Sequence, residues 1–275
     1  MQRIPTGVSD LDSIIKGGVP AGSTVLLFGE LGAGNIDFAY TSAAKLILAK
    51  MYPERKESLL GYYARSAKIP ENMIYITFSR SKDDILMEIK NAFSKEFFEA
   101  ISSNMVFKDF SGEYFRGTVV PSRWSGSSVP SFLSGSGERN ILEAFVNYVD
   151  SVGEDSMIIV DSLTDLLISD SINPKDVVMT LKGLQRVSKK WKGVIYFLLT
   201  REVVDKKIEH MIVDSVDGVF SFTWSKQERS SRRQRYLYVE KFTSLFPHLG
   251  ESKIARFVTM VTADGGYIVI NMERI

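Results

Sequence analysis

The stretch from Gly29 to Ile36 reads Gly-Glu-Leu-Gly-Ala-Gly-Asn-Ile, and it decides how the rest of the chain is interpreted. A phosphate-binding loop has the pattern G-x-x-x-x-G-K-[ST] between a strand and a helix. Gly29 and Gly34 fill the glycine positions, but Asn35 stands at the lysine position and Ile36 at the hydroxyl position. The sequence therefore keeps the frame of a phosphate loop without the two side chains that contact phosphate and Mg²⁺. The candidate nucleotide-binding positions are Gly29, Glu30, Leu31, Gly32, Ala33, Gly34, Asn35 and Ile36.

The segments that flank the loop have the patterns of a strand and a helix. Ser23–Phe28 is a short apolar run with β-branched residues, and it follows the turn-forming residues Pro20-Ala21-Gly22. Residues 37–50 are rich in apolar side chains and contain no proline or glycine, which favours a helix. Strand, glycine turn and helix is the order in which a phosphate loop occurs.

An acidic residue follows another strand pattern further along the chain. Ser156–Ser162 is a continuous apolar run that ends in Asp161, which is typical of a strand buried on both faces of a parallel sheet. Such sheets bind ligands at the carboxyl ends of their strands, and in phosphate-loop enzymes this aspartate organises Mg²⁺. A turn or cap acid after a strand is the alternative interpretation. The glycine loop in the same chain favours the functional one, so we take Asp161 as a Walker B-like residue.

The order of the patterns predicts an α/β fold with a mostly parallel central sheet and helices on both faces. The predicted parallel strands lie near residues 23–28, 74–78, 157–161 and 194–200, and the predicted helices near 37–50, 82–100, 138–151 and 175–190. Residues 235–241, 254–262 and 267–271 are expected to add antiparallel strands at the C-terminal side, the last two joined by a turn at Asp264-Gly265-Gly266.

We expect one domain over residues 1–275, with two unusual segments. Residues 51–72 are predicted to form a helical insertion, and residues 111–137 a long loop rich in serine and glycine. Among 275 residues there is no cysteine and there are two histidines far apart, which excludes disulfides and zinc-thiolate sites and predicts no metal centre. No apolar run is long enough to span a membrane and no secretory signal opens the chain, so we expect a cytoplasmic protein.

Motifs along nearly the whole chain, in order, resemble those of the KaiC-like branch of the RecA superfamily. That branch has a threonine-glycine and a leucine-aspartate before a G-G-[IV]-P-x-G turn, then the loop, the core strands and a late R-x-L-x-[VI]-x-K strand. The matching segments here are Pro5–Asp12, Gly17–Ser23, Ile74–Phe78, Val160–Leu163, Gly193–Thr200, Asp217–Phe220 and Arg235–Lys241. The resemblance implies a RecA-like P-loop NTPase fold.

The departures from that family fall on its catalytic positions. Active members read T-F-E-E-S after the second strand, where the glutamate polarises water, whereas this chain has Ser79 and Arg80 after Phe78. Members also follow the late lysine with a hydrophobic residue and an arginine that reaches the neighbouring subunit's nucleotide. Here Lys241 is followed by Phe242 and Thr243, so only the lysine remains for such a contact. Loss of an arginine of this kind alone costs orders of magnitude in turnover.

These substitutions predict a pseudo-ATPase with no catalytic residue, which acts as a scaffold or regulatory subunit. A lost lysine–phosphate bond weakens binding by about 1.5–3 kcal/mol. The backbone N–H groups of the loop still favour an anion, so ATP or ADP bound weakly and without Mg²⁺ is compatible with the sequence. We expect Arg80 to form an internal ion pair with Asp161 or Asp37. The alternative is that Arg80 replaces the missing cation of the triphosphate site.

Two other functions fit parts of the sequence. One is a slow or active ATPase with displaced catalytic residues. The other is a nucleic-acid-binding RecA paralogue without hydrolysis, which would use the basic stretch Lys226–Arg235; a solvated hairpin tip is the plainer interpretation of that stretch. The net charge of +1 gives no overall attraction to nucleic acid. The family resemblance further implies a homo-oligomer, or a hetero-oligomer with an active paralogue, through an edge that includes Lys241.

Overall fold

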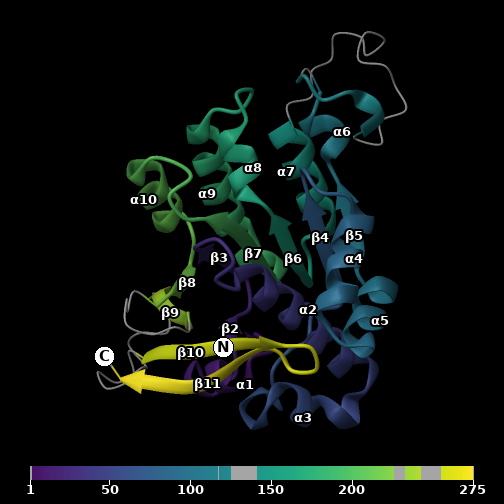
Figure 1. Ribbon diagram of the computed structural model, residues 1–275, viewed down its shortest axis with the longest axis vertical. Helices are drawn as coiled ribbons and strands as arrows, with labels where there is room; N and C mark the ends of the chain where they lie inside the picture. The colour runs from purple at the N-terminus through teal and green to yellow at the C-terminus, as the bar shows by residue number, and fades with distance from the viewer. Residues whose placement is uncertain (1, 117, 125–140, 226–232, 243–254, 275) are drawn as a thin grey trace.

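The computed structural model describes residues 2–116, 118–124, 141–225, 233–242 and 255–274. Its centre is a nine-stranded sheet in the order β11-β10-β9-β8-β3-β7-β6-β4-β5 (Figure 1). The strands are β3 (Ser23–Gly29), β4 (Asn72–Thr77), β5 (Val106–Asp109), β6 (Ser156–Asp161), β7 (Val194–Thr200), β8 (Gly218–Trp224), β9 (Arg235–Phe242), β10 (Ala255–Thr262) and β11 (Gly266–Arg274). The short strands β1 (Arg3–Ile4) and β2 (Val19–Pro20) form a separate pair.

The sheet is parallel through its buried half and antiparallel towards its C-terminal edge. β3, β4, β5, β6, β7 and β8 pair in parallel, whereas β8–β9, β9–β10 and β10–β11 pair antiparallel. This confirms the predicted mostly parallel sheet with antiparallel C-terminal strands. Every residue of β3 and β6 is buried, as expected for strands covered on both faces.

Helices cover the two faces of the sheet because successive strand residues point to opposite sides. Val25 and Leu27 pack into one core with α1, α2, α4 and α5, while Leu26 and Phe28 pack into the other with α7, α8, α9 and α10. The helices are α1 (Ser9–Ile14), α2 (Asn35–Met51), α3 (Lys56–Leu60), α4 (Lys82–Ala92), α5 (Lys95–Asn104), α6 (Ser111–Tyr114), α7 (Ile141–Val152), α8 (Leu163–Ile168), α9 (Pro174–Trp191) and α10 (Lys206–Asp214). In Figure 1, α6 to α10 lie at one end of the molecule, and β10 and β11 lie at the other end near α1.

Several details differ from the sequence-based expectation. The single helix expected over 82–100 is two helices, because the backbone at Phe93 and Ser94 is extended and Ser94 binds the carbonyl of Ala263. The edge strand β5 and the helix α10 were not predicted. β5 is only partly buried, so it lacks the continuous apolar run that marks the central strands.

The two unusual segments contain more local structure than a plain insertion and loop. Residues 51–72 include α3 and the 3-10 turns Pro53–Arg55 and Tyr62–Ala64, and their status as an insertion stays a prediction. Within the expected loop 111–137, α6 and a 3-10 turn at Ser122–Trp124 are formed, so the segment is not loop throughout. Its residues 117 and 125–137 lie outside the described part of the chain.

One aromatic residue of α2 holds the helix to the sheet. The ring of Phe38 lies 5.5 Å from Phe222, 5.7 Å from Tyr267, 5.8 Å from Phe220 and 6.0 Å from Tyr196, measured between centroids, in edge-to-face arrangements. Phe38 is fully buried. It therefore joins β7, β8 and β11 to the helix that follows the glycine loop.

We expect Phe38→Ala to lower the free energy of unfolding by about 3–5 kcal/mol, because the cavity cannot close between three strands. Urea unfolding followed by circular dichroism measures this loss. The control is Met87→Ala, since Met87 is 58% exposed and its truncation should change stability by less than about 0.5 kcal/mol. Equal losses in the two variants would contradict the anchoring role of Phe38.

Candidate functional site

The glycine loop has the backbone shape that its glycines permit. Gly32 and Gly34 adopt positive φ angles of 72° and 106°, a region that other residues rarely adopt. Gly34 is the N-cap of α2, and no side chain caps the first N–H groups of this 17-residue helix. The loop thus retains backbone donors and a helix N-terminus, which together favour an anion.

Asn35 turns its side chain back onto the strand that precedes the loop. Its Nδ2 lies 3.5 Å from the carbonyl oxygen of Leu27. A Cβ atom at Gly29 would lie only 2.7 Å from Cγ of Asn35, so Gly29 is the residue that leaves room for the amide. Ile36, at the former hydroxyl position, is partly buried and packs against the core on the α2 side. Neither side chain supplies a charge or a metal ligand.

Residues from the C-terminal strands hold the loop from outside. The indole Nε1 of Trp224 donates to the carbonyl of Leu31 at 2.9 Å, and Nε of Arg235 donates to the carbonyl of Gly32 at 3.1 Å. Glu30 accepts a hydrogen bond from the backbone N–H of Trp224 at 3.0 Å. The loop is therefore fixed by β8 and β9, residues that the sequence patterns did not connect to it.

Arg80 lies at the end of β4 among acidic and phenolic groups. Its Nη1 is 3.7 Å from Oδ2 of Asp161 and 3.5 Å from the hydroxyl of Tyr40, and its Nη2 binds Glu88. The expected contact between Arg80 and Asp161 is confirmed. The shorter contact is with Glu88, which the sequence analysis missed because nothing in its helical pattern marks an inward-facing acid. No ion pair between Arg80 and Asp37 is formed among the described residues.

Asp161 is buried at the end of β6 and is held by a tyrosine. The hydroxyl of Tyr75 donates to Oδ2 of Asp161 at 2.6 Å and lies 3.5 Å from the hydroxyl of Tyr40. Burial raises the pKa of Asp161 to about 6, although the Tyr75 hydrogen bond and the charge of Arg80 act in the opposite direction. The group that would organise Mg²⁺ in a relative is therefore already bound to two side chains of this chain.

Asp37 is a partly buried acid in the first turn of α2, directly after the loop. Burial raises the pKa of Asp37, and the charge of Glu88 adds to this shift while Arg235 opposes it. Ser79 and Arg80 offer no carboxylate to polarise water, and Glu88 is engaged by Arg80. Among the described residues, no group of three or more histidine or acidic side chains is arranged to hold a metal ion.

Lys241 lies away from the loop and binds its own chain. Its Nζ donates to the carbonyls of Val216 at 2.7 Å, Val213 at 2.8 Å and Asp214 at 3.1 Å, at the C-terminus of α10. A cation at this position complements the negative end of a helix. Its contact with a neighbouring subunit stays a prediction. The hairpin strands on either side of the basic stretch Lys226–Arg235 are formed, but residues 226–232 of that stretch lie outside the described residues.

Solved structures provide the comparison with known proteins. No protein-family model and no curated protein matches the chain. The KaiC-like protein PH0186 from Pyrococcus horikoshii OT3 aligns with 98% of this chain and 99% of its own, at 18% identity and a TM-score of 0.62. The flagellar accessory protein FlaH from Methanocaldococcus jannaschii aligns over 98% and 99%, at 14% identity and a TM-score of 0.64.

The chain has the same α/β fold as the KaiC-like protein PH0186 and FlaH. The fold class implied by the motif order is thereby confirmed. At these identities the comparison establishes the fold alone, and the roles of Asn35, Arg80 and Asp161 rest on the geometry above. No helix within the described ranges is both long and apolar enough to cross a membrane.

Asp161→Asn should flatten the dependence of stability on pH in mildly acidic solution. A carboxyl whose pKa is higher in the folded than in the unfolded state binds its proton more tightly in the folded protein. Its contribution to the free energy of unfolding is therefore fully present below the unfolded pKa of about 4, and it is lost as the pH rises through the folded pKa of about 6. The free energy of unfolding that Asp161 contributes, and that is lost over this pH range, is at most about 3 kcal/mol. Urea unfolding at intervals from pH 4 to pH 7 measures it.

Asp12 provides the internal reference for that experiment. It is fully buried, and burial raises its pKa to about 7 despite hydrogen bonds from Thr6 and Gly7. The decline in the free energy of unfolding that Asp12 causes should therefore remain in Asp161→Asn. It should extend to higher pH than the decline that Asp161 causes. Identical pH profiles for the natural protein and Asp161→Asn would contradict the assignment.

Lys241→Met should lower the free energy of unfolding by about 1–3 kcal/mol, since three backbone carbonyls lose a charged donor. The same loss is expected at low and high protein concentration, because all three bonds are within one chain. The control is Lys95→Met, whose exposed ion pair with Glu99 contributes little. A loss found only at high protein concentration would instead indicate a contact between subunits.

Proposed function

We propose that this protein is a non-catalytic member of the KaiC/RecA-like fold that acts as a scaffold or regulatory subunit. The observation that carries the proposal is the arrangement of Asn35. Where a phosphate-binding lysine would project into the site, the amide of Asn35 packs over Gly29 and approaches the carbonyl of Leu27. A residue in this position neither neutralises a triphosphate nor orients it.

The second support is the charge balance around Asp161. Arg80 is the nearest cation to this carboxyl, and it also binds Glu88, so its charge is shared between two acids. A cation that is already paired gains little from approaching phosphate, because the buried carboxylate of Asp161 would lose its charge partner. We therefore favour an internal ion-pair role for Arg80 over that of a replacement for lysine.

The mode of action is proposed by analogy of fold. FlaH, which shares this fold, is described as an accessory protein. We propose that the present chain likewise supports other proteins in the cytoplasm, either as a homo-oligomer or together with an active paralogue. ATP or ADP bound weakly, without Mg²⁺, is the nucleotide behaviour that the remaining backbone donors would support.

A second candidate function is a slow ATPase with displaced catalytic residues. The observation that favours it is Glu88, whose carboxylate is held by Arg80 close to Asp161. In such an enzyme Glu88 would replace the glutamate missing at position 79 or 80. Hydrolysis that is present in the natural protein and abolished in Glu88→Gln would establish this function.

Calorimetric titration with ATP and ADP, with and without Mg²⁺, tests the first proposal. We expect the natural protein to bind neither nucleotide in a Mg²⁺-dependent manner. Asn35→Lys/Ile36→Thr should bind at least about 10-fold more tightly, since it restores one charge-assisted bond and the Mg²⁺ ligand. The single variant Asn35→Lys is the matched control, and it should gain affinity without Mg²⁺ dependence.

The double variant should still fail to hydrolyse ATP, because Ser79 and Arg80 provide no base. Tight Mg²⁺-dependent binding by the natural protein would overturn the pseudo-enzyme proposal. Folding of each variant is checked by its unfolding transition in urea, so that a loss of binding is not mistaken for a loss of structure.

A further inference from the structure

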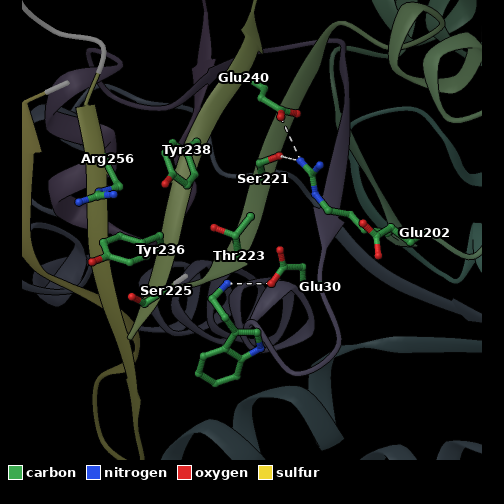
Figure 2. A pocket seen from close by; sticks show the side chains of 11 residues that line it. Glu30, Glu202, Ser221, Thr223, Ser225, Tyr236, Tyr238, Glu240 and Arg256 are labelled. Atoms are coloured by element: carbon green, nitrogen blue, oxygen red, sulfur yellow. Dashed lines mark hydrogen bonds and ion pairs between the residues drawn. The ribbon is translucent and has the colours of Figure 1, made fainter. Parts of the chain in front are cut away.

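A pocket of about 590 Å³ lies on the sheet at the ends of β3 and β7, where β8, β9 and β10 form its floor. Of its lining residues, Glu30 alone also belongs to the candidate nucleotide-binding positions of the glycine loop. Figure 2 shows its lining side chains projecting from these strands and from the loops after β3 and β7. The lining combines aromatic rings, hydroxyl groups, two arginines and three glutamates.

The floor is rigid because its residues lie in register across three strands. Tyr238 pairs with Ser221 of β8 and with Arg256 of β10, and in the next row Tyr236 pairs with Thr223. The rings of Tyr236 and Tyr238 are 6.4 Å apart. Tyr236 is almost fully buried, whereas Tyr238 is partly exposed and presents its ring to the pocket.

The cations of the pocket are already placed against partners. Arg201 donates to Glu240 at 3.0 Å and to Ser221, and its guanidinium lies 4.0 Å from the centroid of Phe28. The guanidinium of Arg256 lies 4.3 Å from the centroid of Tyr236. The contact between Arg256 and Tyr236 shows that an aromatic ring of this pocket accepts a guanidinium group.

Two acids at the rim have no cation beside them in the described chain. Glu30 follows β3 and Glu202 follows β7, and the two strands are paired at Gly29 and Thr200. The side chain of Glu30 accepts a hydrogen bond from the backbone N–H of Trp224, and no ion pair to either Glu30 or Glu202 is formed by a described residue. With Glu240 paired to Arg201, the described residues that line the pocket comprise three glutamates and two arginines.

We propose that this pocket binds a guanidinium or primary ammonium group. The cation would bind the carboxylates of Glu30 and Glu202, and the part of the molecule attached to it would extend along the pocket towards the ring of Tyr238. Charge-assisted bonds to carboxylates and cation–π contact with an aromatic ring are the interactions that recognise such groups. The carboxylates of Glu30 and Glu202 disfavour a phosphate group directly beside them.

The same chemistry has two sources: a basic side chain of a protein segment, or a free amine such as a polyamine. The experiment includes both. Binding to the purified full chain is measured at low salt by calorimetry with N-acetyl-arginine amide, with spermidine, and with a capped peptide that has the sequence of residues 226–235. N-acetyl-glutamine amide is the neutral control compound.

Glu30→Gln/Glu202→Gln removes the two charges and leaves an amide oxygen at position 30 that still accepts from Trp224. We expect this variant to bind the arginine compound about 10-fold more weakly. The matched control Glu54→Gln/Glu143→Gln removes two exposed acids elsewhere and should not change the affinity. Tyr238→Leu should weaken binding about 3-fold and Tyr238→Phe should not, because only the first removes the ring.

Each outcome has a defined meaning. Preference for the peptide over spermidine supports the proposal with a protein segment as the source, and the reverse supports it with a free amine. Absence of binding for all three cationic compounds overturns the proposal, as does equal affinity in Glu30→Gln/Glu202→Gln and the natural protein. No nucleotide is present, so the result is independent of the nucleotide titration of the glycine loop.

Discussion

The junction between β3 and α2 constrains the rest of the molecule, because both elements are buried along most of their length. The turn between them must reverse direction within a few residues, and Gly32 and Gly34 provide the positive φ angles that this requires. Phe38 then fixes the start of α2 against three strands. A loop held in this way by packing keeps its shape whether or not it binds phosphate.

This separation between packing and chemistry explains why the loop has its shape with Asn35 and Ile36 at its end. In a phosphate loop the side chains at these two positions contact phosphate and metal, whereas the glycines and the apolar residues of the following helix hold the structure. In this chain the glycines and the buried apolar residues of α2 are present. A lysine and a hydroxyl at positions 35 and 36 are therefore not required for this loop shape.

The charges at the ends of β4 and β6 are paired with one another within the chain. Arg80, Glu88 and Asp161, with the hydroxyls of Tyr40 and Tyr75, form one connected group at the ends of β4 and β6. On the other side of the loop, the pocket around Tyr238 has the opposite property, since its rim acids Glu30 and Glu202 have no cation beside them among the described residues. The first arrangement pairs its charges within the chain, whereas we propose an external cation for the second.

The sequence by itself determined the order of the central strands along the chain, the glycine loop and the identity of the substituted residues. These features follow from continuous apolar runs in β3, β6 and β7 and from glycine spacing, which act over short distances. The sequence did not reveal β5, α10, the break at Phe93 and Ser94, or the partners Glu88 and Tyr75. Tertiary structure alone decided these, and also the binding of Lys241 to α10 and the pocket between Glu30 and Tyr238. Each depends on residues far apart in the chain, and no local pattern encodes which of them will meet.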